Sequence, residues 1–174
     1  MSDLKYPVGE YVMQPFSNVL KKEWLLDIQS LPLFLENAIL NLDEQQLNVP
    51  YREGGWTVKQ VIHHWADSHM NDYVRFKLGF TEDNPVIEAY DEVKWAELDD
   101  VKELPINISI TLLHALHIRW YAFLQAFTNS DFDKTIFHPG HNKEFTLWQL
   151  LGMYAWHGRH HVAHITTLRK RMKW

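Results

Sequence analysis

The spacing of apolar residues constrains this chain more than any other feature of its sequence. Apolar side chains recur at intervals of three and four residues in four segments, which begin near Leu20, Val58, Ser109 and Leu147. This interval matches the turn of an α-helix, so each segment is expected to bury one stripe of its surface. No segment shows the regular alternation of a β-strand. The sequence therefore predicts an all-α fold, a four-helix bundle.

A few residues predict where these helices begin and break. Pro32 interrupts the first segment, so we expect either one kinked helix or two short helices that meet there, because proline lacks an amide donor and crowds the preceding turn. Thr57 with Gln60, and Thr146 with Gln149, match the capping box that satisfies free amides at a helix start. The second and fourth helices are expected to begin at these two threonines.

The remaining stretches predict the connections. About residues 1–18 contain prolines and glycine without helical periodicity, which indicates an extended N-terminal arm. Residues 86–106 predict a long connection with a short helix near residues 92–98, and residues 132–142 a short polar segment. There is no internal repeat and no flexible linker. We therefore expect residues 1–174 to form a single helical-bundle domain.

Composition excludes several classes of function. The net charge of −5 disfavours nucleic acid as a partner, because binding to phosphates needs a basic surface. The chain has no cysteine, so any metal must be held by His, Asp or Glu. No run of apolar residues is long enough to span a membrane, and the first residues lack the apolar core of a signal peptide. We expect no membrane partner and a cytoplasmic location.

Histidine is the unusual residue, with 11 in the chain. Four of them lie within the last periodic segment, where residues four apart share a helix face and can converge on one ion. This spacing offers two competing pairs, His157 with His161 and His160 with His164. A third ligand must come from another helix. His63 and His64 are both candidates, and periodicity does not decide between them.

The other histidines have a simpler explanation. An isolated histidine in a helix is usually a surface group or a hydrogen-bonded core group. We assign that interpretation to five residues: His69, His114, His117, His138 and His141. The cluster in the last segment differs, because burying several imidazoles without a partner is costly and a bound cation would compensate. The spacing therefore favours a metal site over a purely structural cluster.

Several longer strings resemble a known family. They are residues 51–71 (YREGGWTVKQVIHHWADSHMN), 75–78 (RFKL), 81–85 (TEDNP), 90–92 (YDE) and 156–165 (WHGRHHVAHI). These strings look like the YfiT branch of the DinB/YfiT superfamily, and the likeness runs over nearly the whole chain. The resemblance implies a four-helix bundle that forms homodimers and holds one zinc-like ion per subunit with three histidines.

The resemblance also selects residues. The first ligand of the family follows the tryptophan that opens the second helix by eight residues, which falls on His64. The other two fall on His157 and His161. His164 stands where some relatives have glutamine, so it is an additional candidate near the metal. We expect one divalent ion per subunit, zinc in the first place and nickel as the alternative.

The resemblance implies two alternative activities. Members are described as metal-dependent hydrolases, in which a three-histidine ion activates water. Related branches are thiol S-transferases of the bacillithiol type, in which the ion activates a low-molecular-weight thiol. The substrate would be a small molecule in either case. Asp67, three residues after His64, is a candidate to orient a ligand imidazole or to accept a proton. A non-catalytic metal-binding stress module and a purely structural helical dimer are the alternatives without turnover.

Overall fold

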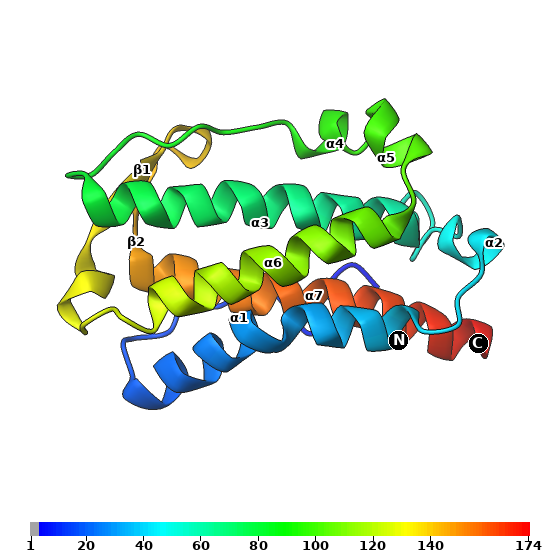
Figure 1. Ribbon diagram of the computed structural model, residues 1–174, viewed down its shortest axis with the longest axis horizontal. Helices are drawn as coiled ribbons and strands as arrows, with labels where there is room; N and C mark the ends of the chain where they lie inside the picture. Colours follow the sequence, from blue (N-terminus) through cyan, green and yellow to red (C-terminus); the bar gives the residue numbers. More distant parts are fainter. Residues whose placement is uncertain (1–3) are drawn as a thin grey trace.

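The computed structural model describes residues 4–174, and four long helices dominate it (Figure 1). They are α1 (Asn18–Ile39), α3 (Val58–Thr81), α6 (Ile106–Leu124) and α7 (Leu147–Met172). Helices α1 and α3 each pack against both α6 and α7. Helices α1 and α3 therefore lie diagonally opposite each other in the bundle, and α3 packs directly against α7. The predicted all-α bundle is confirmed.

The core fills the space between these helices with large apolar side chains. All four long helices contribute fully buried side chains: Ile28, Leu31 and Leu35 from α1, Ile62, Trp65 and Phe76 from α3, Leu113, Trp120 and Leu124 from α6, and Leu150 and Leu151 from α7. Burial of such side chains supplies most of the driving force for folding. No described helix is long and apolar enough to cross a membrane.

The helix starts follow the predicted signals closely. Thr57 and Thr146 both cap their helices, and each forms the complete capping box with Gln60 or Gln149. The first segment forms one continuous helix with Pro32 inside it, so the alternative of two short helices is wrong. Helix α6 begins three residues earlier than the predicted Ser109, at Ile106, because Pro105 occupies the cap position.

The bundle also carries a short β-hairpin that the sequence did not predict. Part of the expected polar segment and the four residues after it form an antiparallel hairpin of β1 (Thr135–His138) and β2 (Lys143–Thr146), joined by the short 3-10 helix η2 (Pro139–His141). Another 3-10 turn, η1 (Ser130–Asp133), precedes it. Ile136 and Phe145 pair across the hairpin and are buried against the bundle. Each strand has four residues, which is too short for alternation to stand out in the sequence.

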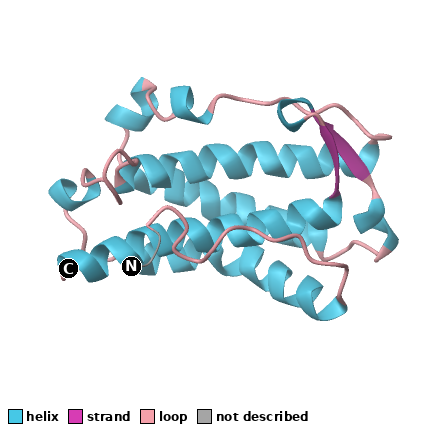
Figure 2. Cartoon of the chain, turned by 180° about the vertical axis from the view of Figure 1, so that it is seen from behind, coloured by secondary structure: helices cyan, strands magenta, loops and turns pink. Residues whose placement is uncertain are grey.

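Short helices and the N-terminal arm cover the bundle. The long connection contains α4 (Glu92–Trp95) and α5 (Asp99–Glu103), which lie along α3 (Figure 1). Helix α2 (Glu44–Leu47) was not predicted. The described part of the arm, residues 4–17, has no helix and runs across the bundle before α1 (Figure 2). Its backbone accepts hydrogen bonds from Trp148 and Trp156 of α7, at 2.8 and 3.0 Å. Residues 1–3 of the predicted arm lie outside the described residues.

Candidate metal centre

Three histidines converge where α3 and α7 pack together. His64 comes from the second turn of α3, and His157 and His161 from successive turns of α7. One ring nitrogen from each lies within 4.8 Å of the other two, the one such group found in the described part of the chain. His64 and His161 are buried and His157 is partly exposed. The predicted ligand set is therefore brought together in space.

The donor set suits a divalent transition-metal ion. The Nε2 atoms of His157 and His161 lie 2.9 Å apart. The ring of His64 faces both, with centroids at 5.6 and 5.2 Å. Nitrogen atoms that approach this closely repel one another unless a proton or a cation lies between them. The second ring nitrogen of His161, Nδ1, is buried without a hydrogen-bond partner. An all-imidazole set of this kind is favoured by Zn, Ni and Cu ions.

Burial keeps the three imidazoles neutral, which is the form that binds metal. It lowers the pKa of His64 to about 4. It also holds the pKa values of His157 and His161 well below their ordinary value, and repulsion from the neighbouring histidines lowers them further. All three rings therefore have a free lone pair at neutral pH.

The competing pair of the same helix points elsewhere. His160 stacks on Trp156 with ring centroids 4.6 Å apart. His164 stacks on Tyr51 at 3.9 Å, and its Nε2 lies 3.1 Å from the backbone oxygen of Lys5. The candidate extra ligand His164 is thus close to the site, with its ring 5.5 Å from that of His161, but its polar contact is with the N-terminal arm.

His63 also faces away from the three converging histidines. Its Nδ1 lies 2.8 Å from the hydroxyl oxygen of Ser109 on α6. Neighbouring residues of a helix point in directions about 100 degrees apart, so the adjacent His63 and His64 have different surroundings. Of the two candidates, the structure brings His64 to the pair on α7.

A cavity of about 230 Å³ opens beside the three histidines. It lies between the arm, the loop before α3 and helices α3, α4 and α7, so residues from five parts of the chain surround it. Its lining combines aromatic rings, cations and one carboxylate: Lys5, Tyr6, Tyr51, Arg52, Trp56, Glu92, Trp156, His160 and His164, with the three converging histidines. A small molecule can therefore reach the nitrogen atoms.

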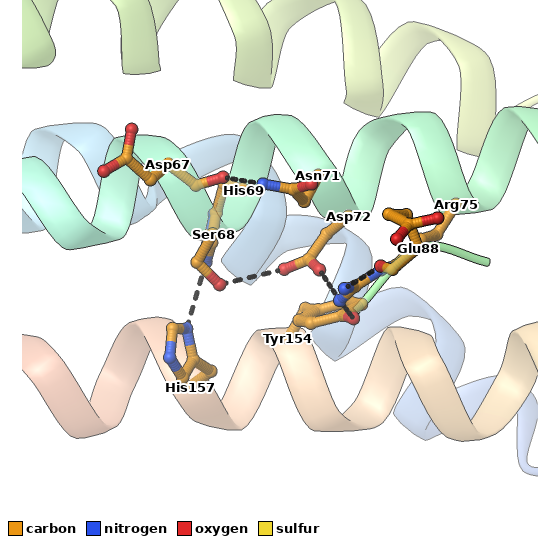
Figure 3. Close-up of polar contacts among 9 residues, drawn as sticks. All are labelled: Asp67, Ser68, His69, Asn71, Asp72, Arg75, Glu88, Tyr154 and His157. Carbon is orange, nitrogen blue, oxygen red and sulfur yellow. Dashed lines mark hydrogen bonds and ion pairs between the residues drawn. The ribbon is translucent and has the colours of Figure 1, made fainter. Parts of the chain in front are cut away.

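Asp67 does not contact the three histidines in the described structure. It is half-buried on α3, and its backbone oxygen accepts a hydrogen bond from Asn71 (Figure 3). Burial raises the pKa of its carboxyl to about 6, and Asp100 of α5 raises it further. The Asp67 carboxyl is thus affected by a charge on the long connection, and no contact of Asp67 supports the predicted role in orienting a ligand.

A different residue contacts a ligand candidate from behind. The Nε2 atom of His69 lies 3.3 Å from Nδ1 of His157 (Figure 3). The other ring nitrogen of His69 lies 2.9 Å from Nε2 of His117. Both residues are buried, as the interpretation of hydrogen-bonded core groups allowed. Nothing in the spacing of the sequence distinguishes them from ordinary core histidines, so their link to His157 was missed.

Further along the contact between α3 and α7 lies a buried charge cluster. Arg75 donates a hydrogen bond to Asp72 at 2.9 Å and another to the hydroxyl of Tyr154 on α7 at 3.3 Å (Figure 3). It also donates to the backbone oxygen of Glu88 at 3.0 Å. Burial raises the pKa of Asp72 to about 7, although Arg75 acts in the opposite direction. The cluster ties the long connection, which carries Glu92, to the two helices of the site.

Comparisons with known proteins agree with this architecture. The sequence profile of the DinB superfamily matches residues 35–165. Proteins of Bacillus cereus (strain AH820) and Bacillus anthracis (strain A0248) are 50% identical over the full length of both chains, and both are named "Putative metal-dependent hydrolase". The solved structure of YfiT from Bacillus subtilis superposes with a TM-score of 0.96, at 46% identity and 98% coverage of each chain. It was described as a probable metal-dependent hydrolase with an unusual four-helix bundle topology.

Proposed function

The chain belongs to the DinB superfamily, and we propose that it is a metal-dependent hydrolase whose divalent ion is held by His64, His157 and His161. The observation that carries this proposal is the convergence of three neutral imidazoles at the wall of an open cavity. The names of its relatives support the reaction class. Zinc is the expected ion and nickel the alternative, because both accept three imidazoles.

When bound, a divalent ion would polarise a carbonyl group and lower the pKa of a water molecule. The chain's own residues would do the rest. Glu92 is the one carboxylate among the described residues that line the cavity. Desolvation by the surrounding protein raises the pKa of the Glu92 carboxyl, although the positive charge of Arg75 acts in the opposite direction. We assign Glu92 the role of general base, in which one of its carboxylate oxygens accepts a proton from the attacking nucleophile.

The cavity also limits the substrate. Its volume of about 230 Å³ is below the usual range of small-molecule pockets, which begins at about 300 Å³. Tyr51, Trp56 and Trp156 offer aromatic faces, and Arg52 places a cation at the same cavity. A small substrate with an apolar part and a carbonyl group matches this lining.

Metal analysis and a paired activity screen test the proposal. The metal-loaded protein is assayed against esters and amides, and against electrophiles with and without added low-molecular-weight thiols. Turnover of an ester or amide without thiol is expected, with at least a tenfold loss in Glu92→Gln. Little change is expected in His114→Ala, since His114 of α6 pairs with Glu36 and does not line the cavity. Turnover only with thiol would replace hydrolysis by S-transfer. Bound metal without any turnover would favour the non-catalytic module.

The expected homodimer stays a prediction. The sequence resemblance motivates it, and several large apolar side chains are exposed on the described chain, among them Leu33, Leu40 and Ile118. Sedimentation velocity of the metal-loaded protein at micromolar concentration should give the mass of two chains. A stable species with the mass of one chain would contradict the prediction.

A further inference from the structure

Behind the candidate metal centre, a chain of imidazoles runs through the core. From His157 it passes to His69 over 3.3 Å and from His69 to His117 over 2.9 Å. The Nδ1 atom of His117 then contacts the backbone oxygen of Ile28 on α1. Three histidines from α7, α3 and α6 and a carbonyl group of α1 thus form one hydrogen-bonded line across all four long helices.

The end of this line at α1 is available because of a proline. In an α-helix, the carbonyl oxygen of Ile28 would accept from the amide of residue 32. That residue is Pro32, which has no amide hydrogen. The oxygen is therefore free to accept from His117. Since a carbonyl oxygen only accepts, Nδ1 of His117 must carry the hydrogen.

That assignment fixes every other hydrogen along the line. Both rings are buried, and their hydrogen-bond partners are ring nitrogens and a carbonyl oxygen with no carboxylate among them, so each ring is neutral and has one N–H group. With its hydrogen on Nδ1, His117 accepts at Nε2, and Nδ1 of His69 donates to it. The Nε2 atom of His69 is then an acceptor.

The last step of the line reaches the candidate metal centre. The Nδ1 atom of His157 lies 3.3 Å from this acceptor, so it can bond to it only as a donor. The indole nitrogen of Trp65 lies 2.7 Å from Nε2 and 3.2 Å from Nδ1 of His69. A donor this close to both ring nitrogens is off the axis of the Nε2 lone pair, which leaves that lone pair to His157.

From this we propose that His69 and His117 are positioning residues, which hold His157 as the Nδ1–H tautomer with its Nε2 lone pair turned toward the metal centre. The Nε2 atom is the one that lies 2.9 Å from Nε2 of His161. Ligand histidines commonly donate their other nitrogen to a carboxylate or a carbonyl group. Here the acceptor is a neutral imidazole, and Pro32 supplies the terminal carbonyl group. The metal part of this inference rests on the proposed function, whereas the tautomer assignment does not.

Nitrogen-15 NMR of histidine-labelled, metal-free protein at pH 7 tests the assignment directly. The ring nitrogen shifts and their couplings to the ring hydrogens report which nitrogen carries the hydrogen. We expect the Nδ1–H form for His157, His69 and His117 in the unsubstituted protein. An Nε2–H form of His157 there would overturn the inference without the need for any variant.

Two variants then separate positioning from packing. His69→Gln keeps an acceptor oxygen for His157, whereas His69→Leu fills similar space without one. For Zn²⁺ measured against a competing chelator, we expect affinity to fall 10- to 100-fold in His69→Leu and clearly less in His69→Gln. The tautomer of His157 should become mixed only in the leucine variant. His63→Gln, which replaces a buried histidine of α3 outside the line, is the matched control.

The outcomes remain distinguishable from those of the proposed function. Equal Zn²⁺ affinity and an unchanged His157 tautomer in a folded His69→Leu protein would overturn the positioning role. If His69→Leu fails to fold, the comparison of the unsubstituted protein with His69→Gln still decides, because a tautomer other than Nδ1–H in either protein contradicts the line. The Nδ1–H tautomer of His157 in a protein that binds no metal would support the hydrogen-bonded line and reject the metal proposal.

Discussion

Arg75 joins three parts of the chain through one guanidinium group. It bonds to Asp72 within α3, to Tyr154 of α7 and to the backbone at Glu88. Asp72 has no exposed surface, so its charge depends on Arg75 and on the hydroxyl of Ser68. Removing one member of such a buried pair leaves the other charge without compensation, which costs more than the pair itself contributes.

Replacing Arg75 by alanine should therefore lower the free energy of unfolding by about 3–5 kcal/mol. Urea denaturation followed by circular dichroism measures this loss. Arg75→Ala combined with Asp72→Asn should recover part of it, because the amide leaves no buried charge. A loss below about 1 kcal/mol in the single variant would show that the cluster is hydrated and contributes little.

At the scale of single elements, the sequence predicted what local chemistry decides. Capping residues and apolar spacing located the starts of α3 and α7, because these signals act within one turn. The hairpin of Thr135–His138 and Lys143–Thr146 was missed, since its short strands are stabilised by burial of Ile136 and Phe145 against helices distant in sequence. The uninterrupted course of α1 through Pro32 likewise depends on packing against other helices.

The candidate site shows the same division. Helical spacing proposed two chelating pairs on α7, and only the contacts of His160 with Trp156 and of His164 with Tyr51 separate them in space. The resemblance to a known family had selected the pair that the structure brings to His64. Neither helical spacing nor the family resemblance could predict the hydrogen-bonded line through His69, because that line depends on how three helices pack together.

At Gly158, α7 packs closely against Leu31 of α1. A methyl group at this position would collide with the side chain of Leu31, which is fully buried. Gly158→Ala should therefore destabilise the protein by about 1–3 kcal/mol through overpacking, although alanine favours a helix by about 1 kcal/mol. Thermal denaturation measures the sum. A stabilised variant would show that Leu31 moves aside without cost.

For the whole molecule, the buried histidines predict how stability depends on pH. Burial lowers the pKa values of His64, His117 and His160 to about 4, from about 6.5 in the unfolded chain. Between these values the unfolded chain binds more protons than the folded one, so stability falls as the pH falls. Asp72, with its pKa raised to about 7, and Asp27 and Asp67, with pKa values raised to about 6, act in the opposite direction, but the histidines of lowered pKa outnumber them.

The metal-free protein should therefore lose stability as the pH is lowered from 6.5 toward 4. Each histidine that stays neutral contributes a loss of about 1.4 kcal/mol per pH unit in this window. Calorimetric scans at half-unit intervals of pH should show the denaturation midpoint decreasing throughout. A midpoint that rises on acidification would mean that the raised carboxyl groups, and not the imidazoles, dominate the balance.

Metal content of purified, untagged variants tests the central claim most directly. The account predicts about one divalent ion per chain in the unsubstituted protein, and loss of that ion in His64→Ala, His157→Ala and His161→Ala, because three nitrogen donors are needed to hold it. His160→Ala, which alters the same helix one residue away, should retain the ion. Full metal content in His157→Ala and His161→Ala, with loss in His160→Ala, would contradict the account.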